Sequence, residues 1–423
     1  NMGGEVLEIK STRTLKKFAS KIRHSDIIVD AIFGTGLTTD VRGVCKDAID
    51  LINKSSKPIV SVDIPSGIDA TNGRLLGRAV RADITATMAL AKLGSVIYPG
   101  RDYTGELILV DIGLPSQLVE DSSIEWNLID VDTVKDTLRP RSADTHKGSY
   151  GHVLTIGGAL GKDGAPIMTG MASMKSGAGL STVAMAKSLI NNTKLELEVM
   201  GVALSEESDG TLGKASLEDS INALKGKSVL VFGPGLGAVS LDYAEGLLEE
   251  AISKKIPVVI DADGLNLFKG KTALLKKLTD KGLKAVLTPH PGEAARLLNI
   301  TTKVVEADRL SAAKELSSKT GTVVVLKGSA TIVYADGETY INTSGNAGMA
   351  TAGAGDVLAG MVGALLAQGY TLREAATVGV YMHGLAGDLA VVKAGQTSLT
   401  ATDIIDFIPS AFEGVVKETG CCG

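Results

Sequence analysis

Short apolar runs alternate with amphipathic segments along most of this 423-residue chain. In its first part, residues 26–33 and 58–64 are mostly apolar, as strands buried on both faces of a parallel sheet require, and each run ends in turn residues. Residues 84–89 and 106–111 have the same character. The pattern therefore predicts a first α/β unit built on a parallel sheet.

A second series of apolar runs begins at residues 151–157 and ends in a long helical region after Gly355. Further strands are predicted at residues 228–232, 257–261, 285–288, 322–326 and 331–334. The last of these pairs with residues 338–342, because Asp336-Gly337 between two such runs is a strong signal for a tight hairpin. Amphipathic helices are predicted at residues 240–253 and 306–319. The order of a parallel sheet, a hairpin edge and a helical end predicts a second α/β domain.

The two series are separated by residues 114–145, which have scattered charge, two prolines and weak periodicity. We place the domain boundary in this region. The predicted organisation is a first domain over residues 1–125, a linker over 126–145 and a second domain over 146–415.

Composition narrows the classes of function. The formal net charge is −5, so no broad positive surface is expected to attract nucleic acid. No apolar run approaches the ~18 residues of a membrane span, and the first residues do not resemble a signal peptide. The three cysteines, Cys45, Cys421 and Cys422, have no disulfide or zinc spacing. We expect a cytoplasmic enzyme that binds neither nucleic acid nor membrane.

The most informative loop precedes the helix predicted after Gly355. The 50 glycines of the chain cluster at the ends of apolar runs, and this loop, residues 346–355, contains three of them before Asp356. Small residues let the backbone approach a phosphate, and the amides at a helix N-terminus offer it unpaired donors. Asp356 at the start of the helix could accept the proton of an attacking hydroxyl group. The alternative is that Gly353 and Gly355 only shape the loop and Asp356 only caps the helix.

Other loops follow strands of the same predicted sheet, where ligands of open α/β sheets bind. Residues 327–331 join two strands, and their glycine and hydroxyl groups suit the edge of a nucleotide pocket. His290 is followed by Glu293 at the start of the next helix, which predicts a substrate or metal-water clamp, although a lone histidine is more often structural. Residues 232–237 resemble a dinucleotide fingerprint but lack its glycine spacing, so we interpret them as a close-approach loop.

Six motifs in order carry a family resemblance between residues 145 and 361. They read THKGSYGHVLTIGG, GPGLG, DADGLN, TPHPGEAARL, KGSATIV and GNAGMATAGAGDVLAGM. Together they resemble the ADP- or ATP-dependent NAD(P)H-hydrate dehydratases of the ribokinase-like superfamily. That resemblance implies a three-layer α/β/α domain in which the six-position hydroxyl of hydrated NADH or NADPH is phosphorylated and phosphate is then eliminated. It also implies Mg²⁺ with the nucleotide, and a homo-oligomer.

The resemblance assigns roles residue by residue. It implies that Asp356 is the catalytic base and also contacts the substrate. The implied nucleotide-binding residues are Lys327, Gly328, Ser329, Ala330, Thr331, Asn346, Ala347, Gly348, Met349, Ala350, Thr351, Ala352, Gly353, Ala354 and Gly355. The implied residues around the hydrate are Gly235, His290, Pro291, Gly292, Glu293, Ala294, Ala295 and Arg296.

The first domain resembles a partial Rossmann-like NAD(P)H-hydrate epimerase, through DAIFGTG at residues 30–36 and VDIPSG at residues 62–67. The resemblance implies that Asp30 and Ser66 bind potassium. The implied hydrate-binding residues are Gly34, Thr35, Gly36, Leu37, Thr38, Thr39, Asp40 and Asp63. The Asn-Asn-Gly-Gly-Asp-Gly loop of that family is not found here, so we expect an incomplete epimerase domain. Alternatively, Asp30 and Asp63 only cap strand ends.

Two other functions remain open from the sequence. One is a ribokinase-like kinase for a vitamin-precursor alcohol, because such kinases share the glycine loop before Asp356. The other is a non-catalytic nucleotide-binding protein. The turn at residues 290–293 and the upstream epimerase-like segment favour the hydrate, and we prefer ADP over ATP.

Overall fold

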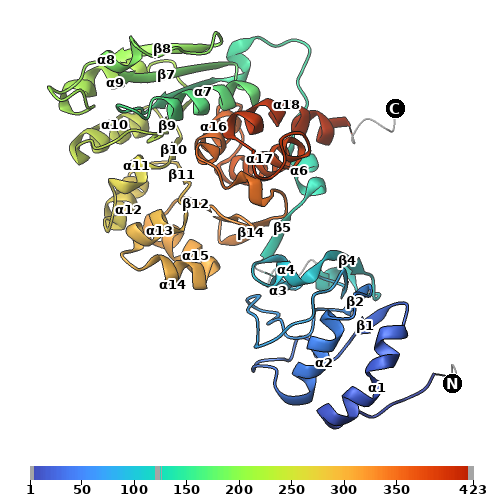
Figure 1. Cartoon of the computed structure of the whole chain (residues 1–423). Coiled ribbons are helices and arrows are strands. Elements are labelled where there is room, and N and C mark those ends of the chain that lie inside the picture. Colours follow the sequence, from blue (N-terminus) through green and yellow to red (C-terminus); the bar gives the residue numbers. More distant parts are fainter. Residues whose placement is uncertain (1–3, 120–123, 125, 418–423) are drawn as a thin grey trace. The chain divides into compact units, whose positions relative to one another are not determined.

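A computed structural model describes residues 4–119, 124 and 126–417, and Cys421 and Cys422 lie outside this range. The chain divides into two compact units, unit 1 over residues 1–124 and unit 2 over residues 125–423 (Figure 1). Each unit has its own sheet and its own hydrophobic core.

Unit 1 contains a sheet with the strand order β1-β2-β3-β4, all parallel. Its strands are β1 (Ile28–Asp30), β2 (Ile59–Val62), β3 (Ile84–Met88) and β4 (Glu106–Val110). Its helices are α1 (Thr12–His24), α2 (Gly43–Asn53), α3 (Leu93–Val96), α4 (Arg101–Thr104) and α5 (Ser116–Val119). The four predicted strands and their parallel pairing are confirmed.

The core of unit 1 lies between α2 and the sheet. Ile49 and Ile52 of α2 pack with Ile59 of β2 and with Val41 and Val80 from the adjoining loops. Alternate residues of β2 and β3 are buried, so the strand ends are held in a fixed register. That register determines where the side chains after β1 and β2 lie.

Unit 2 contains a larger sheet, with the strand order β5-β14-β13-β12-β11-β10-β9-β6-β7-β8 among the described residues. Its strands are β5 (Trp126–Ile129), β6 (His152–Ile156), β7 (Leu180–Ala186), β8 (Val199–Leu204), β9 (Val229–Phe232), β10 (Val258–Ile260), β11 (Ala285–Leu287), β12 (Val323–Leu326), β13 (Ile332–Ala335) and β14 (Glu338–Asn342). Strands β6 to β12 pair in parallel, and β13 is antiparallel to both neighbours.

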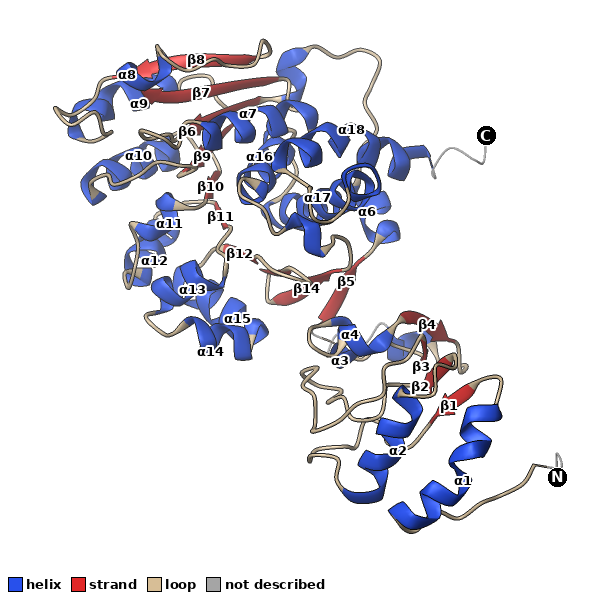
Figure 2. Cartoon of the chain, in the orientation of Figure 1, coloured by secondary structure: helices blue, strands red, loops and turns tan. Residues whose placement is uncertain are grey.

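Helices cover both faces of this sheet (Figure 2). The α-helices of unit 2 are α6 (Val131–Thr137), α7 (Gly164–Lys175), α8 (Lys187–Ile190), α9 (Leu217–Ala223), α10 (Leu241–Ser253), α11 (Asp263–Asn266), α12 (Thr272–Asp280), α13 (Pro291–Leu298), α14 (Thr302–Ala307), α15 (Arg309–Thr320), α16 (Ala354–Ala367), α17 (Leu372–Ala394) and α18 (Ala401–Lys417). Short 3-10 helices are η1 (Lys147–Tyr150), η2 (Lys214–Ser216) and η3 (Ala347–Met349).

Alternate residues of the central strands enter two different cores. Val229 and Val231 of β9 pack with α7, α16, α17 and α18, whereas Leu230 and Phe232 pack with α10, α12, α13 and α15. This alternation follows from the two-residue period of a strand, and it explains why the central strands are apolar at nearly every position. The predicted three-layer α/β/α architecture is confirmed.

Several local predictions can be compared with the structure. The hairpin at Asp336-Gly337 is confirmed: β13 and β14 are antiparallel, and both turn residues have positive φ, as the tight turn requires. The helix predicted at residues 306–319 begins at Arg309 because Asp308 accepts a hydrogen bond from Ser311 N and caps α15. Strands β7 and β8 were not predicted.

The predicted linker over residues 126–145 needs correction. Strand β5 pairs in parallel with β14 at one edge of the large sheet, and α6 contacts α17 and α18. Residues 126–137 are thus part of unit 2. The short β5 could not be recognised because its pairing partner lies more than two hundred residues further along the chain.

Helix α17 is the one described helix long and apolar enough to cross a membrane by length and composition. It is packed between α16 and α18, and 61% of its most apolar window is buried inside the protein. Burial of this kind is the ordinary situation of a core helix.

Candidate active site

The sheet of unit 2 brings polar side chains together at the carboxyl ends of three adjacent strands. Asp261 directly follows β10, Thr288 directly follows β11, and Lys327 directly follows β12. Because these strands are parallel neighbours, their ends lie at the same edge of the sheet. Helix α16 begins at this edge, where an added Cβ on Gly355 would lie 3.1 Å from Lys327 Nζ.

A lysine and two acidic side chains make direct contacts in this cluster. Lys327 Nζ donates a hydrogen bond to Asp261 Oδ1 over 2.8 Å and lies 3.9 Å from Glu293 Oε2. Thr288 Oγ1 donates to the same oxygen of Asp261 over 2.7 Å. Burial acts to lower the pKa of Lys327, but Asp261 and Glu293 raise it above its ordinary value. The lysine is therefore a charged ammonium.

Asp356 lies in the first turn of α16, as the sequence predicts. Burial, followed by the negative charge of Asp261, raises the pKa of Asp356 to about 7. A carboxyl group with this pKa can accept a proton at neutral pH and still be partly ionised beforehand. A simple helix cap would not need such an environment, and among the described residues no side chain accepts a capping hydrogen bond from the first amides of α16.

His290 and Glu293 are brought together, but mainly through the start of α13. Glu293 Oε2 accepts a hydrogen bond from His290 N over 2.8 Å, and His290 Nδ1 accepts one from Gly292 N over 3.0 Å. The two side chains thus form a capping box. Burial raises the pKa of Glu293 to about 7, while burial and then Lys327 lower the pKa of His290.

The remaining residues predicted on α13 divide between the surface and the core. Arg296 is exposed and donates to Asn266 Oδ1 over 2.9 Å. Ala294 and Ala295 are buried in the core beneath the helix. The side chains of these two alanines therefore face the core, because consecutive residues of a helix point in different directions, and their predicted contact with the hydrate stays a prediction.

Hydrogen bonds from Arg309 fix the turn at residues 327–331. Its guanidinium group donates to the carbonyl oxygens of Leu326, over 3.1 Å, and of Ser329. Gly328 has a φ of +145°, and an added Cβ would lie 2.9 Å from this guanidinium. Burial lowers the pKa of Arg309 to about 10. The turn predicted to contact the nucleotide is thus fixed by a half-buried cation.

The loop at residues 345–355 is held by a side chain that the sequence analysis missed. Asp388 on α17 accepts hydrogen bonds from Gly345 N over 2.8 Å and from Asn346 Nδ2 over 2.9 Å. Asn346 Oδ1 in turn accepts from Gly348 N. Gly353 has a φ of +88°, which allows the chain to turn into α16.

The loop containing Gly235 approaches the same end of the sheet. Gly235 has a φ of +59°, and a side chain there would collide with the backbone of Lys162. Gly237 N donates to Asp263 Oδ2 over 2.9 Å, and Lys162 Nζ lies 3.2 Å from the same oxygen. These contacts fit the predicted close-approach loop.

In unit 1, Asp30 and Ser66 are in direct contact and both are buried. Ser66 Oγ donates to Asp30 Oδ1 over 2.7 Å, and Asp30 Oδ2 accepts from Ser61 Oγ and from Ser66 N. Ser66 Oγ also lies 3.2 Å from the carbonyl oxygen of Phe33. Three oxygen atoms of the kind that bind hard cations therefore converge here.

Asp63 occupies a separate position at the end of β2, with a φ of +69° that a non-glycine residue rarely adopts. It forms an ion pair with Lys92, which the sequence analysis did not single out. Burial acts to raise the pKa of Asp63, but hydrogen bonds from Lys92 and Met88 lower it overall. The predicted residues 34–40 form a mostly exposed turn in which Leu37 packs onto the core.

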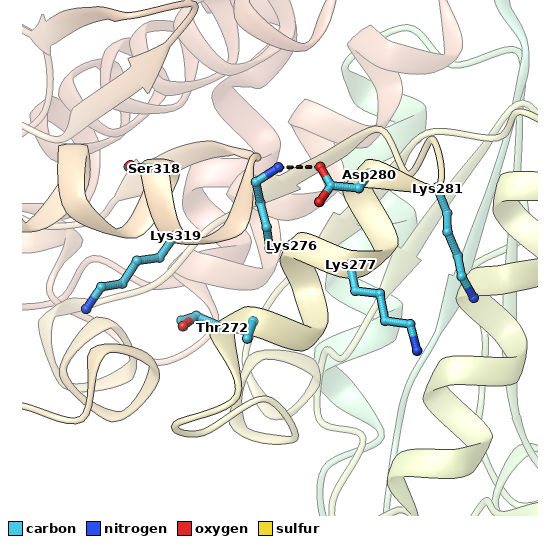
Figure 3. Close-up of a pocket in the computed structure, with 8 residues that line it drawn as sticks. Thr272, Lys276, Lys277, Asp280, Lys281, Ser318 and Lys319 are labelled. Carbon is cyan, nitrogen blue, oxygen red and sulfur yellow. Dashed lines mark hydrogen bonds and ion pairs between the residues drawn. The ribbon is translucent and has the colours of Figure 1, made fainter.

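Two surface cavities of unit 2 lie outside these groups. The first, of about 670 Å³, lies between α12 and α15, and its lysines are mostly ion-paired, as for Lys276 with Asp280 (Figure 3). The second, of about 610 Å³, is lined by residues from two segments, 207–217 and 238–243. Neither cavity includes a residue predicted for the site, so the size of a cavity does not mark the cluster of carboxylates with raised pKa values.

Comparisons with known proteins identify the family to which both units of the chain are similar. The family model described as NAD(P)H-hydrate dehydratase matches residues 153–410, and the model described as YjeF-related protein N-terminus matches residues 1–94. The bifunctional NAD(P)H-hydrate repair enzyme of Moorella thermoacetica is 38% identical, over 99% of this chain and 78% of that protein. The corresponding enzyme of Thermofilum pendens is also 38% identical, over 98% of this chain and 78% of that protein.

Solved structures resemble unit 2. The Bacillus subtilis ADP/ATP-dependent NAD(P)H-hydrate dehydratase, crystallised with ATP and Mg²⁺, has a TM-score of 0.60 and 25% identity, covering 69% of this chain and 99% of its own. A ribokinase-like superfamily protein of Enterococcus faecalis has a TM-score of 0.56 and 28% identity, covering 70% of this chain and 98% of its own. The predicted ribokinase-like fold is confirmed. By sequence and by fold, this chain belongs to the family of bifunctional NAD(P)H-hydrate repair enzymes.

Proposed function

We propose that unit 2 restores NADH and NADPH from the S form of their hydrates, with ADP or ATP as the phosphoryl donor. The observation that carries this proposal is the partly buried Asp356, whose pKa is raised to about 7, in the first turn of α16 and beside the Lys327 ammonium. A carboxylate, a fixed cation and a helix N-terminus are the groups that phosphoryl transfer to a hydroxyl requires.

In the first step, the hydroxyl oxygen at position 6 of the hydrate bonds to the terminal phosphorus of the nucleotide. Asp356 accepts the proton that this hydroxyl loses. The bond from that phosphorus to the nucleotide breaks, and AMP leaves when ADP is the donor. In the second step the phosphate leaves carbon 6, carbon 5 loses a proton, and the double bond of the dihydropyridine returns. The ammonium of Lys327 and the amides of α16 stabilise the negative charge of the transferred group.

The loops around Asp356 would hold the nucleotide. We place it against the turn at residues 327–331, which Arg309 fixes, and the loop at residues 345–355, which Asp388 fixes. No group of three acidic, histidine or cysteine side chains with metal-binding geometry is present among the described residues. A Mg²⁺ ion bound mainly through nucleotide phosphates and water fits this donor set, and it would neutralise phosphate charge.

The direct test is an assay of the intact protein with NADH hydrate and either ADP or ATP. We expect the absorbance of the dihydronicotinamide to return with one or both nucleotides. Asp356→Asn should abolish this return while nucleotide binding survives, because the substitution removes the base and leaves the loops intact. Turnover by the variant would rule out Asp356 as the base.

For unit 1 we propose a hydrate-binding site that includes Asp63 and a potassium site at Asp30. Asp30 Oδ1, Ser66 Oγ and the Phe33 carbonyl oxygen supply hard oxygen ligands. Potassium chloride should therefore raise the melting temperature of the protein more than sodium chloride does. Asp30→Asn should remove this difference, and an equal response to both salts would contradict the potassium site. Interconversion of the R and S hydrates without nucleotide would show that unit 1 is also an epimerase.

A further inference from the structure

The ammonium of Lys327 sits between three acidic side chains and the start of α16. Its own side chain is only 18% exposed, so its position is set by the protein. The ammonium contacts Asp261 over 2.8 Å and Glu293 over 3.9 Å. It also lies against Gly355, which immediately precedes Asp356 on α16.

Asp261 is the most deeply buried member of this cluster, with 1% of its side chain exposed. Its backbone is fixed at the end of β10, where Asp261 N donates to Phe232 O over 3.1 Å. Oδ1 accepts from both Lys327 and Thr288, and Oδ2 lies 4.0 Å from where a Cβ on Gly355 would be. Asp261 therefore anchors the lysine from β10, across the intervening β11.

A purely structural reason for this pair is weak. Burying a lysine and a carboxylate removes both from water, and apolar residues of similar volume stabilise a core at least as well. Here the pair lies at the carboxyl edge of the sheet, beside a helix N-terminus and a carboxylate of raised pKa. Charged groups concentrated in this way are typical of sites that bind and transfer charged groups.

The groups facing Asp356 come from several elements. Asp261 and Asp263 follow β10, Glu293 lies on α13, and Lys327 follows β12. On α17, His383 is neutral, because burial lowers its pKa to about 4. Lys327 is thus the positive partner of Asp356 in this set. Asp261, at 2.8 Å from the ammonium, competes with Asp356 for the same charge.

We propose that Asp261 is a positioning residue, which holds the Lys327 ammonium at the N-terminus of α16 and thereby controls both phosphoryl transfer and the ionisation of Asp356. The proposal rests on the dehydratase function proposed for unit 2. In it, Asp261 never contacts substrate. It acts through Lys327 by fixing the ammonium beside the transferred phosphoryl group, and it keeps that ammonium from pairing fully with Asp356.

Two substitutions test this with opposite expected signs. Asp261→Asn keeps the shape and the hydrogen bond from Thr288 but removes the charge. The acid limb of the pH profile of kcat/KM should move about one pH unit lower, because two changes lower the pKa of Asp356. The negative charge of Asp261 is lost, and the ammonium of Lys327 becomes free to pair with Asp356. Lys327→Gln removes the positive charge, so the acid limb should move upward.

The rates give a second readout. With Asp261→Asn, kcat at pH 8 should fall about tenfold or more, since the ammonium is misplaced, while the KM for the nucleotide changes less than about threefold. Asp280→Asn is the matched control. It makes the same chemical change on the exposed surface of α12 and should leave the rates and the acid limb unaltered.

An active Asp261→Asn protein with an unshifted acid limb would overturn the proposal and leave Asp261 a structural role. If Asp261→Asn does not fold, an unshifted or downward-shifted limb in Lys327→Gln would overturn it instead. Wild-type protein that returns no dihydronicotinamide with either nucleotide would overturn the proposed function, and this inference with it. A wild-type signal with opposite shifts in the two variants supports both.

Discussion

Replacing the proposed base should make the protein more stable. The pKa of Asp356 is raised from an ordinary value of 3.8 to about 7, first by burial and then by Asp261. Ionisation of this side chain is therefore less favourable in the folded protein than in the unfolded chain. The difference between the two pKa values corresponds to about 4 kcal/mol of lost stability once the group is charged in both states.

The sign of the pH dependence follows from the raised pKa. Below pH 3.8 Asp356 is protonated in both states and has no effect of this kind. The destabilisation grows as the pH rises above 3.8 and is complete above about pH 7. Asp356→Asn, which cannot ionise, should therefore gain about 4 kcal/mol at pH 8 and about 2 kcal/mol at pH 5, both as upper limits because neighbouring carboxylates readjust.

The assay is urea unfolding of both proteins at pH 8 and pH 5. Trp126, the single tryptophan of the sequence, lies in β5 of unit 2 and reports the unfolding of that unit by its fluorescence. Asp280→Asn, on the exposed surface of α12, controls for loss of a carboxylate in general. If Asp356→Asn is no more stable than wild type at pH 8, or if its gain in free energy of unfolding is the same at both pH values, ionisation of Asp356 does not destabilise the folded protein and the reasoning is wrong.

Three further outcomes are expected. Wild-type kcat/KM should fall about tenfold per pH unit as the pH drops below about 7, because Asp356 must be ionised to accept a proton; a flat profile to pH 5 would contradict its assignment. Asp388→Ala should weaken ADP binding about tenfold or more in calorimetric titration, since two hydrogen bonds to the loop at residues 345–348 are lost, and leave the KM for the hydrate unchanged. Gly360→Ala should lower stability by about 1–3 kcal/mol in thermal or urea unfolding, because the added methyl group collides with the backbone of α7, whereas Gly414→Ala, at an exposed position of α18, should be neutral or stabilising.

Much of the chemistry could be located from the sequence because it follows strands. Apolar runs that end in glycine, proline or polar residues mark the carboxyl edge of the sheet, and this pattern predicts that residues 290–296, 327–331 and 346–356 lie near one another. The structure brings Lys327, Glu293 and Asp356 into one charged cluster. The pattern of apolar runs and turn residues therefore indicates where each loop lies along the chain.

The residues that the sequence analysis missed act on partners far away in the chain. Asp261 was part of a recognised motif, but its partner Lys327 lies 66 positions later, and nothing local indicates that they meet. Asp388 lies within a helix and holds a loop 43 positions earlier. An acidic residue directly after a buried strand was a usable signal for Asp261. For Asp388, an acidic residue in a helix, the ordinary expectation is solvent exposure.

The composition of the cluster explains why its parts depend on one another. Asp261, Glu293 and Asp356 surround a single ammonium, so full ionisation would leave excess negative charge where we propose that the phosphates of the nucleotide bind. Two of these carboxyl groups avoid this at neutral pH by having pKa values of about 7, which lets them remain partly protonated. Asp261 stays paired with Lys327 and so keeps the ammonium in place. The glycines before Asp356 add no side chains, so in the proposed reaction the phosphate reaches both the ammonium of Lys327 and the amides of α16. In that reaction the Asp356 carboxylate, which repels the phosphate when it is charged, is also the acceptor for the hydroxyl proton.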